Sequence, residues 1–298
     1  MIAYLLSAYR DPQHLGRLVA ALDYEADFYI HIDANVDEAP FREALPQHVH
    51  FVKRHRISWG GWEQVAYQYE LLKAALASEH HYTHLVCLSA QDYPLWSNKS
   101  IHDFFNQKTE CEFICGHNLT HTDNAAQRHK ITHIHPFRDL SWTNQWLKNK
   151  VIVASRHLLR LLGLRRRPTV CIDGHLCDVY FGSDYWAITP KCAAYVVEHL
   201  EQQPEIKNYF RTTFVPSELC IQTIVFNSPF AANALLHQGS YPGLKQLTPL
   251  HYIDYGACVK ELTAADWPQL EACGKMFCRK VVTDTSDKLV DIIDSQRT

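Results

Sequence analysis

Alternating stretches of apolar and polar residues dominate the first third of the chain. Residues 2–8 form an apolar run that predicts a strand, and Asp11-Pro12 then starts a helix. In that helix Leu15, Leu18, Val19 and Leu22 recur at three- and four-residue spacing, which favours one buried face. The same criteria predict strands at residues 28–32, 49–52, 84–88 and 112–115 and a helix over 63–77.

Regular patterning is lost over residues 117–175 and returns near Tyr180. From there the chain predicts a strand within 179–188 and a helix over 190–200, and Glu218 opens another helix. A late strand is expected at 250–255, and residues 277–281 precede a C-terminal helix.

Strands that alternate with helices indicate an α/β fold with a central, mostly parallel sheet flanked by helices. Ligands of such sheets bind at the carboxyl ends of the strands. In this sequence those ends carry Ser7 to Arg10, Asp33, Ser58 to Gly61 and Asp92-Tyr93. No Gly-x-Gly-x-x-Gly or Gly-x-x-x-x-Gly-Lys-Ser/Thr motif is present, so dinucleotide-binding and P-loop proteins lose their main support.

The bulk composition is that of an ordinary globular protein. The 298 residues are 47% hydrophobic and carry a net charge of -3, so no global basic field favours nucleic acid. The basic runs 53–56 and 165–167 are short, and we interpret them as solvated loops. We expect no signal peptide and no membrane-spanning helix, and we expect a cytoplasmic protein.

One segment could still touch the inner face of the cell membrane. Between residues 151 and 164, Val, Ile and Leu are interspersed with Arg156, His157 and Arg160, and three arginines follow. This pattern fits a basic amphipathic helix on an anionic membrane surface. An ordinary surface helix followed by a basic loop is the alternative.

The 19 histidines raise the question of a metal site. His129, His133 and His135 lie close together, as do His117 and His121, and a metal hydrolase would use such residues. However, no His-Glu-x-x-His motif is present, and the 10 cysteines do not have the spacing of a zinc ribbon. We therefore expect no metal and interpret the cysteines as reduced and mostly buried.

Glu218 is the most distinctive carboxylate of the chain. It lies in the otherwise apolar or neutral stretch 214–223, after Pro216-Ser217. Burial in such surroundings raises a carboxyl pKa, which suits a general base working near neutral pH. Stabilisation of a helix N-terminus is the structural alternative.

Several motifs, in this order, resemble the core-2/I-branching and peptide O-xylosyltransferase family of glycosyltransferases. Together they span residues 2–282, with 117–175 poorly matched. The motifs are residues 3–6, 29–33, Trp59-Gly60-Gly61, 88–95, Gly182-Ser183-Asp184-Tyr185-Trp186, Pro216-Ser217-Glu218 with Asn227-Ser228-Pro229, and Phe277-Cys278-Arg279-Lys280.

The resemblance implies a GT-A type fold, a UDP-sugar donor and inversion at the anomeric carbon. It also implies Glu218 as the catalytic base and Lys280 as a phosphate-binding residue. The branching members need no metal ion, and the chain offers only lone Asp33 and Asp92 at strand ends where a metal-dependent site would have Asp-x-Asp.

We expect a single domain over 1–298, with a nucleotide-binding half (1–115), an irregular insertion (117–175) and an acceptor and catalytic half (176–282).

The expected ligand contacts follow from the resemblance and from the strand ends. The expected donor contacts are Ala8, Asp33, Ser58, His251, Arg279 and Lys280. The expected acceptor contacts are Trp59, Asp92, Tyr93, Ser183 and Trp186.

The donor and acceptor are left open by the sequence. His251 stands where members that transfer N-acetylglucosamine carry an arginine, which leans toward the xylosyltransferase branch. UDP-xylose and UDP-N-acetylglucosamine both stay as candidate donors, and the expected acceptor is a glycan or lipid-linked glycan. A catalytically silent sugar- or nucleotide-binding protein on the same fold is the other interpretation.

Overall fold

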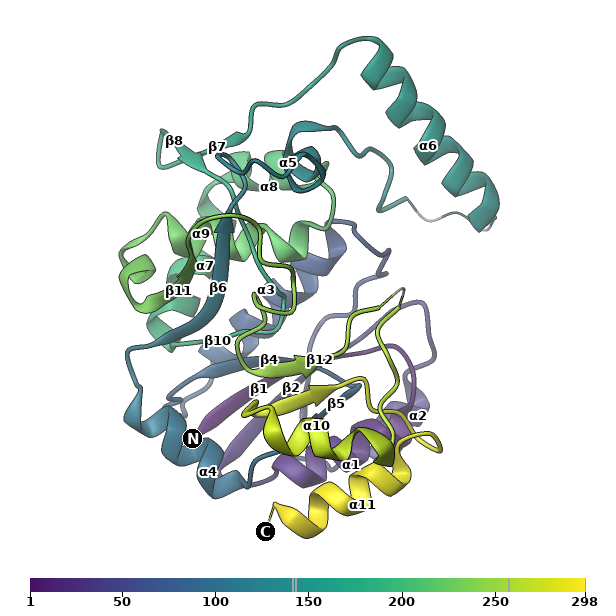
Figure 1. Cartoon of the computed structure of the whole chain (residues 1–298), viewed down its shortest axis with the longest axis vertical. Helices are drawn as coiled ribbons and strands as arrows, with labels where there is room; N and C mark the ends of the chain where they lie inside the picture. The colour runs from purple at the N-terminus through teal and green to yellow at the C-terminus, as the bar shows by residue number, and fades with distance from the viewer. Residues whose placement is uncertain (141, 143, 257, 298) are drawn as a thin grey trace.

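The central feature of the computed structural model is one large sheet with helices on both sides (Figure 1). The structure describes residues 1–140, 142, 144–256 and 258–297. The strand order is β11 (Ala234–His237), β6 (Glu112–Asn118), β10 (Ala187–Ile188), β4 (Leu85–Ser89), β1 (Ile2–Ala8), β2 (Ala26–Ile32) and β3 (His50–Phe51), with β9 (Tyr180–Phe181) paired to β6.

Most pairs in this sheet are parallel. β1 pairs in parallel with β2 and β4, β2 with β3, and β6 with β11, whereas β9 and β10 run antiparallel to their neighbours. The prediction of an α/β fold with a mostly parallel central sheet flanked by helices is therefore confirmed.

The other strands named here form two smaller sheets. One has the order β12 (His251–Ile253), β13 (Phe277–Arg279) and β5 (Asp92–Pro94), and the other is the hairpin of β7 (Thr169–Ile172) and β8 (His175–Asp178). Strand β5 was not predicted, because its three residues are too few for a hydrophobic pattern.

Alternation along β1 divides the apolar core in two. Ile2, Tyr4 and Leu6 belong to one cluster of buried residues, whereas Ala3 and Leu5 belong to the other, because successive strand side chains point to opposite faces. The first cluster includes residues of α1 (Pro12–Leu22), α2 (Ala39–Ala44), α4 (Asn98–Gln107), α10 (Trp267–Ala272) and α11 (Asp287–Gln296). The second includes residues of α3 (Glu63–Leu76), α5 (Ala125–Thr132), α7 (Pro190–Gln202), α8 (Pro204–Phe210) and α9 (Cys220–Phe226).

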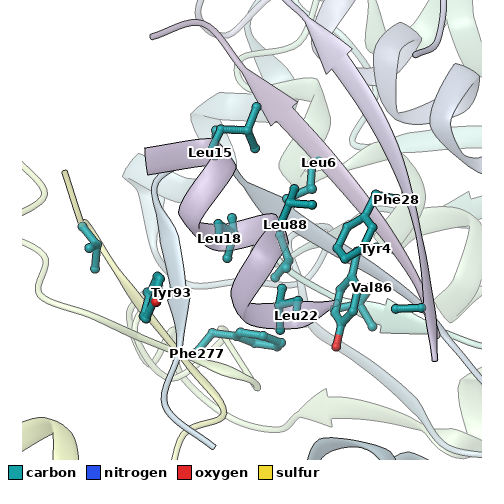
Figure 2. Close-up of a cluster of buried hydrophobic side chains, with 14 of the residues drawn as sticks. Tyr4, Leu6, Leu15, Leu18, Leu22, Phe28, Val86, Leu88, Tyr93 and Phe277 are labelled. Atoms are coloured by element: carbon teal, nitrogen blue, oxygen red, sulfur yellow. The ribbon is translucent and has the colours of Figure 1, made fainter. Parts of the chain in front are cut away.

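Helix α1 shows how the sequence builds the first cluster. The Asp11 side chain accepts a hydrogen bond from the His14 N–H and so caps the helix. The predicted apolar face is buried, and Figure 2 shows Leu15, Leu18 and Leu22 packed with Phe28 and neighbouring strand residues. Each such leucine contributes about 1.5–3 kcal/mol by leaving water.

The segment predicted as irregular contains two helices, α5 and α6 (Gln145–Leu161). Figure 1 shows α6 projecting from the body at the upper right. Short 3-10 turns occur at η1 (Pro216–Glu218), η2 (Pro229–Asn233) and η3 (Ala264–Asp266). Within the described residues, we find no helix with both the length and the apolar character that crossing a bilayer requires.

Candidate functional site

The carboxyl ends of three central strands meet at one edge of the sheet. The Asp33 N–H after β2 donates to the carbonyl oxygen of Ala8 at the end of β1 (2.8 Å). The Ala90 N–H after β4 donates to the carbonyl oxygen of Ser7 (2.9 Å). These bonds hold the predicted strand-end residues together at the place where open α/β sheets bind ligands.

Strand β13 brings basic side chains to this edge from the far end of the chain. It pairs antiparallel with β5, so that Arg279 is opposite Asp92. The Val281 N–H then donates to the carbonyl oxygen of Gln91 (2.9 Å). Arg279 and Lys280 are thereby fixed beside the ends of β1 and β4, as a binding role would require.

Asp92 is a fully buried anchor for this arrangement. Its carboxylate accepts hydrogen bonds from Arg279 Nη1 (3.0 Å) and the Ser89 N–H (2.7 Å), and it lies 3.2 Å from His251 Nε2. Burial alone would raise the pKa of Asp92, but Arg279, His251 and the Ser89 N–H lower it below its ordinary value. With no exposed surface, Asp92 cannot contact an acceptor, so that prediction is wrong, and the residue instead positions Arg279.

His251 is also a structural partner rather than a donor contact. Its side chain has no exposed surface, and its ring packs against Phe277 (5.1 Å between centroids) and Tyr185 (4.9 Å). The expected contact with the donor is therefore corrected. His251 instead contacts Oδ2 of Asp92, whereas Arg279 donates to Oδ1.

A group of cations surrounds the outer end of β13. Lys280 Nζ lies 3.8 Å from Glu261 Oε1, and Arg10 Nη2 lies 3.3 Å from the same oxygen. Burial, and then repulsion from Arg10 and Arg279, lowers the pKa of Lys280. One carboxylate, Glu261, facing the two cations Lys280 and Arg10 leaves a local excess of positive charge, which favours an anionic ligand.

Glu218 lies at the end of a short turn with an unusual entry. Val215 has φ of 52°, in the left-handed region that β-branched residues rarely adopt, and the turn η1 follows. Glu218 closes this turn, and α9 begins at Cys220 rather than at Glu218 as predicted. Its carbonyl oxygen accepts a hydrogen bond from the Gly182 N–H (2.9 Å), which fixes the backbone beside β9.

The Glu218 carboxyl faces a partly desolvated cation. Lys130 Nζ of α5 lies 3.8 Å from Glu218 Oε2 and 3.5 Å from the centroid of the Phe181 ring. Burial raises the pKa of Glu218 to about 8, an effect that Lys130 opposes and Asp184 reinforces. One-fifth of the side chain is exposed, so a ligand can still reach the carboxyl group.

Asp184 and Tyr255 link Glu218 with the cations. Asp184 interacts electrostatically with Glu218, Arg279 and Asp92, and burial raises its pKa. Tyr255 interacts with Asp184, Glu218 and Arg279, and Arg279 also lies 5.0 Å from the centroid of the Tyr185 ring. Glu218 and Arg279 therefore belong to one site, although they are 61 positions apart in the chain.

The remaining predicted donor residues lie along the sheet edge. Asp33 Oδ1 accepts hydrogen bonds from the N–H groups of Asn35 (2.9 Å) and Ile57 (3.1 Å). Ser58 accepts a hydrogen bond from Lys148 Nζ (2.8 Å). Asp33 is partly exposed and can meet a ligand, whereas Ala8 offers mainly backbone because its side chain is buried.

The predicted acceptor residues divide sharply by exposure. Trp59 is 69% exposed and packs edge-on against Phe214 (5.3 Å), four residues before Glu218. Trp186 is 1% exposed within the second core cluster, and Tyr93 is in the first, where Figure 2 shows it beside Phe277. Trp186 and Tyr93 have no face for a sugar ring, so those predictions are wrong.

Ser183 is likewise buried, and it serves the local backbone. Its hydroxyl accepts a hydrogen bond from the Tyr185 N–H (3.2 Å), and its carbonyl oxygen accepts one from Gln222 Nε2 (2.7 Å). These bonds hold the loop that carries Asp184, which gives Ser183 a positioning role in place of the expected acceptor contact.

Two functional candidates were missed by the sequence analysis. Lys130 lay in the poorly patterned segment, where nothing connected it with Glu218. Arg10 was within the strand-end stretch Ser7 to Arg10 but was not selected, although a cation directly after the first strand of such a sheet is a usable signal.

Histidines and cysteines do not assemble into a metal site in the part of the chain that the structure describes. There, no three His, Cys, Asp or Glu side chains come together as metal ligands would. The His129 and His133 rings are in contact, with centroids 4.4 Å apart and planes tilted by 59°, but His135 packs against Phe214.

Comparison with known proteins places the chain in a family. The family model described as Core-2/I-Branching enzyme matches residues 2–286. Two similar proteins are "Xylosyltransferase oxt" of Drosophila melanogaster, 24% identical over 94% of this chain and 31% of the relative, and "Xylosyltransferase 2" of Rattus norvegicus, 24% identical over 98% and 33%. The chain thus spans about a third of the length of these relatives. It belongs to the Core-2/I-Branching enzyme family.

Proposed function

We propose that the chain is an inverting glycosyltransferase that moves a sugar from a UDP-sugar to a hydroxyl group of a glycan or lipid-linked glycan. The family and the names of the two relatives support glycosyl transfer. Those names favour UDP-xylose as donor, and UDP-N-acetylglucosamine is the second candidate. We expect the reaction to take place in the cytoplasm, near the inner face of the membrane.

The environment of Glu218 is the observation that carries this proposal. A carboxyl group whose pKa burial raises to about 8 is a stronger base than a solvated one, and part of it faces solvent. In the proposed reaction Glu218 takes the proton of the acceptor hydroxyl as its oxygen bonds to the anomeric carbon. The bond from that carbon to the UDP oxygen breaks with its electron pair on UDP, which leaves from the opposite face.

The cations at the outer end of β13 are suited to the leaving group. Negative charge gathers on the β-phosphate as the glycosidic bond breaks, and fixed positive charges stabilise it. Arg279 is held by Asp92, whereas Lys280 and Arg10 share one carboxylate. We propose that these three side chains bind the diphosphate without a metal ion. Asp33 is the proposed contact for the uridine, Ala8 and Ser58 line the donor side, and Trp59 offers a flat face to an acceptor sugar.

Thermal shift with nucleotide sugars tests the proposal directly, since a ligand that binds the folded state raises the melting temperature. UDP, UDP-xylose and UDP-N-acetylglucosamine are compared with ADP-ribose, each in excess chelator. We expect stabilisation by UDP and by one UDP-sugar with the chelator present. Stabilisation that depends on added manganese would contradict the metal-free site, and equal shifts with ADP-ribose would contradict a UDP site.

A catalytically silent binding protein on the same fold is the competing interpretation. Donor hydrolysis separates the two, because a competent site releases UDP slowly even without an acceptor. No hydrolysis or transfer with a donor that binds tightly would favour the silent protein. The metal hydrolase finds no ligand group to support it in the described residues.

A further inference from the structure

Helix α6 has no place in the packed body of the protein. Neither cluster of buried apolar residues includes a residue of α6, although both draw on helices around the sheet. Figure 1 shows the helix extended away from the remaining elements. Within its described side chains, Lys148 and Ile152 are the buried ones, at 7% and 8% exposure. Packing into the two core clusters therefore does not explain the apolar residues of α6.

Five of the apolar residues of α6 form one stripe, and four of these five are exposed. Leu147, Val151, Ala154, Leu158 and Leu161 follow one another at spacings of four and three, which places them on one face of a helix. Leu147 is 43% exposed, Leu158 57% and Leu161 85%, and Leu162 continues the stripe at 63%. Such a face in water is unfavourable unless something covers it.

Positive charge surrounds this stripe, and the segment that carries it contains no acid. Residues 145–167 contain seven Lys and Arg, and no Asp or Glu occurs between Asp139 and Asp173. Lys150, Arg160, Arg165 and Arg167 are exposed. In a chain with a net charge of -3, this segment is strongly and locally cationic.

Both ends of the segment are fixed to the body. Lys148 Nζ donates to Ser58 Oγ near the start of α6. After the helix, the Arg166 N–H donates to the carbonyl oxygen of Thr132 (2.9 Å), and its guanidinium lies 4.2 Å from the centroid of the Tyr209 ring. Lys148 and Arg166 therefore attach the segment to the body of the protein, and neither residue belongs to the stripe, which stays on the outside.

We propose that α6 and the arginines after it dock the protein onto an anionic lipid bilayer. The apolar stripe enters the boundary between headgroups and acyl chains, and the flanking cations contact lipid phosphates. Charge complementarity selects this partner: a stripe with this spacing could also pair with a second copy, but two such helices would bring cations together with no acid to neutralise them. This proposal stands independently of the chemistry proposed for Glu218.

Vesicle co-sedimentation of the full chain tests the proposal. The vesicles are phosphatidylcholine alone or an equal mixture with phosphatidylglycerol, at low and high salt. We expect binding to the mixed vesicles, at least tenfold weaker binding to phosphatidylcholine, and weakening by salt because screening acts on the charges. Protein that stays in the supernatant with both vesicles overturns the proposal.

Two variants separate insertion from attraction. L158Q/L161Q removes apolar surface from the stripe without changing the charge, R160Q/R165Q/R167Q removes charge, and each should reduce binding at least tenfold. K191Q/K245Q/K288Q removes three exposed cations elsewhere and should bind like the unaltered protein. Equal loss in R160Q/R165Q/R167Q and K191Q/K245Q/K288Q would reduce the effect to net charge and contradict a specific surface.

Two controls keep the outcomes distinct. Circular dichroism and the thermal shift with UDP report whether each variant is folded and whether the proposed donor site is intact, so a failure at that site is separable from a failure of docking. Sedimentation velocity reports self-association. A dimer of the unaltered chain that L158Q/L161Q abolishes would assign the stripe to a second copy and overturn the membrane proposal.

Discussion

Two carboxylates, Asp92 and Glu218, illustrate how the surroundings decide the role of an acid. Asp92 has no exposed surface and is bound by Arg279, His251 and the Ser89 N–H, which lower its pKa. Glu218 is partly exposed. Among the described residues it forms an ion pair with Lys130 at 3.8 Å, longer than the 3.0 Å between Asp92 and Arg279. An acid with its hydrogen bonds satisfied is held in its charged form, whereas a desolvated one with few partners gains affinity for a proton.

The largest expected effect is on stability, at Asp92. Asp92→Asn removes the negative charge and leaves Arg279 buried without its partner, which should cost about 3–5 kcal/mol of unfolding free energy. Urea unfolding measures this loss. The control Asp103→Asn breaks an exposed pair with Lys99 and should cost at most about 1 kcal/mol. Similar costs for both variants would remove the structural role of Asp92.

The next effect is on nucleotide affinity. Lys280→Met and Arg10→Met keep much of the side-chain volume but remove charge, and each should weaken UDP binding by about 10- to 150-fold, the equivalent of about 1.5–3 kcal/mol. Isothermal titration calorimetry with UDP measures the change, with Lys288→Met as the surface control. If UDP affinity is unchanged in both variants, the diphosphate lies elsewhere.

The pH dependence separates the two carboxylates most clearly. A base must be unprotonated to act, so kcat/KM should rise with pH and level off above about 8, the raised pKa of Glu218. Lys130→Met should shift this limb to higher pH, because Lys130 opposes the rise. A profile that is already flat at pH 6 would show that Glu218 titrates normally.

The raised pKa of Glu218 also makes the stability of the protein depend on pH. The folded state holds the Glu218 proton to higher pH than the unfolded chain, whose glutamate titrates near 4.5. The contribution of this group to unfolding free energy therefore falls as pH rises from about 4.5 to 8. Glu218→Gln should remove that slope, and urea unfolding across this range checks it.

The smallest expected effect is at Trp59. Trp59→Ala should lose about 0.5–1.5 kcal/mol of acceptor binding, seen as a raised acceptor KM with little change in UDP affinity or stability. In contrast, Trp186→Ala should destabilise the fold by about 3–5 kcal/mol because that ring is buried. An acceptor KM unaffected by Trp59→Ala would leave the flat exposed ring without a role.

Much of the fold could be predicted because local patterns determine it. The strands β1, β2 and β4 and the helices α1 and α3 follow from apolar spacing and, in α1, from the Asp11 cap. The limits are also local: Tyr69 has the helical spacing from Val65 and Leu72 that a buried residue would have, but its hydroxyl donates to Glu201 of α7 at the surface. A tyrosine can lie in the core or at the surface, so spacing alone does not predict which of the two it occupies.

The site could be predicted only in part, because its contacts span the chain. Glu218 and Lys280 follow from the resemblance, and both lie at the candidate site. The pairing of Asp92 with His251 and Arg279 joins residues 159 and 187 positions apart through the three-residue strand β5. No short-range sequence pattern predicts such contacts. For the same reason, the sequence could not predict that Trp59 is exposed and Trp186 is buried.

Glu218→Gln tests the central claim most directly, with UDP affinity and sugar transfer measured on one preparation. The substitution keeps the shape of the side chain and removes its capacity to accept the proton. We predict UDP affinity within a factor of about 2 of the unaltered protein, and transfer slowed by about 10²–10⁴-fold. Transfer at nearly the original rate, with UDP bound normally, would contradict Glu218 as the base.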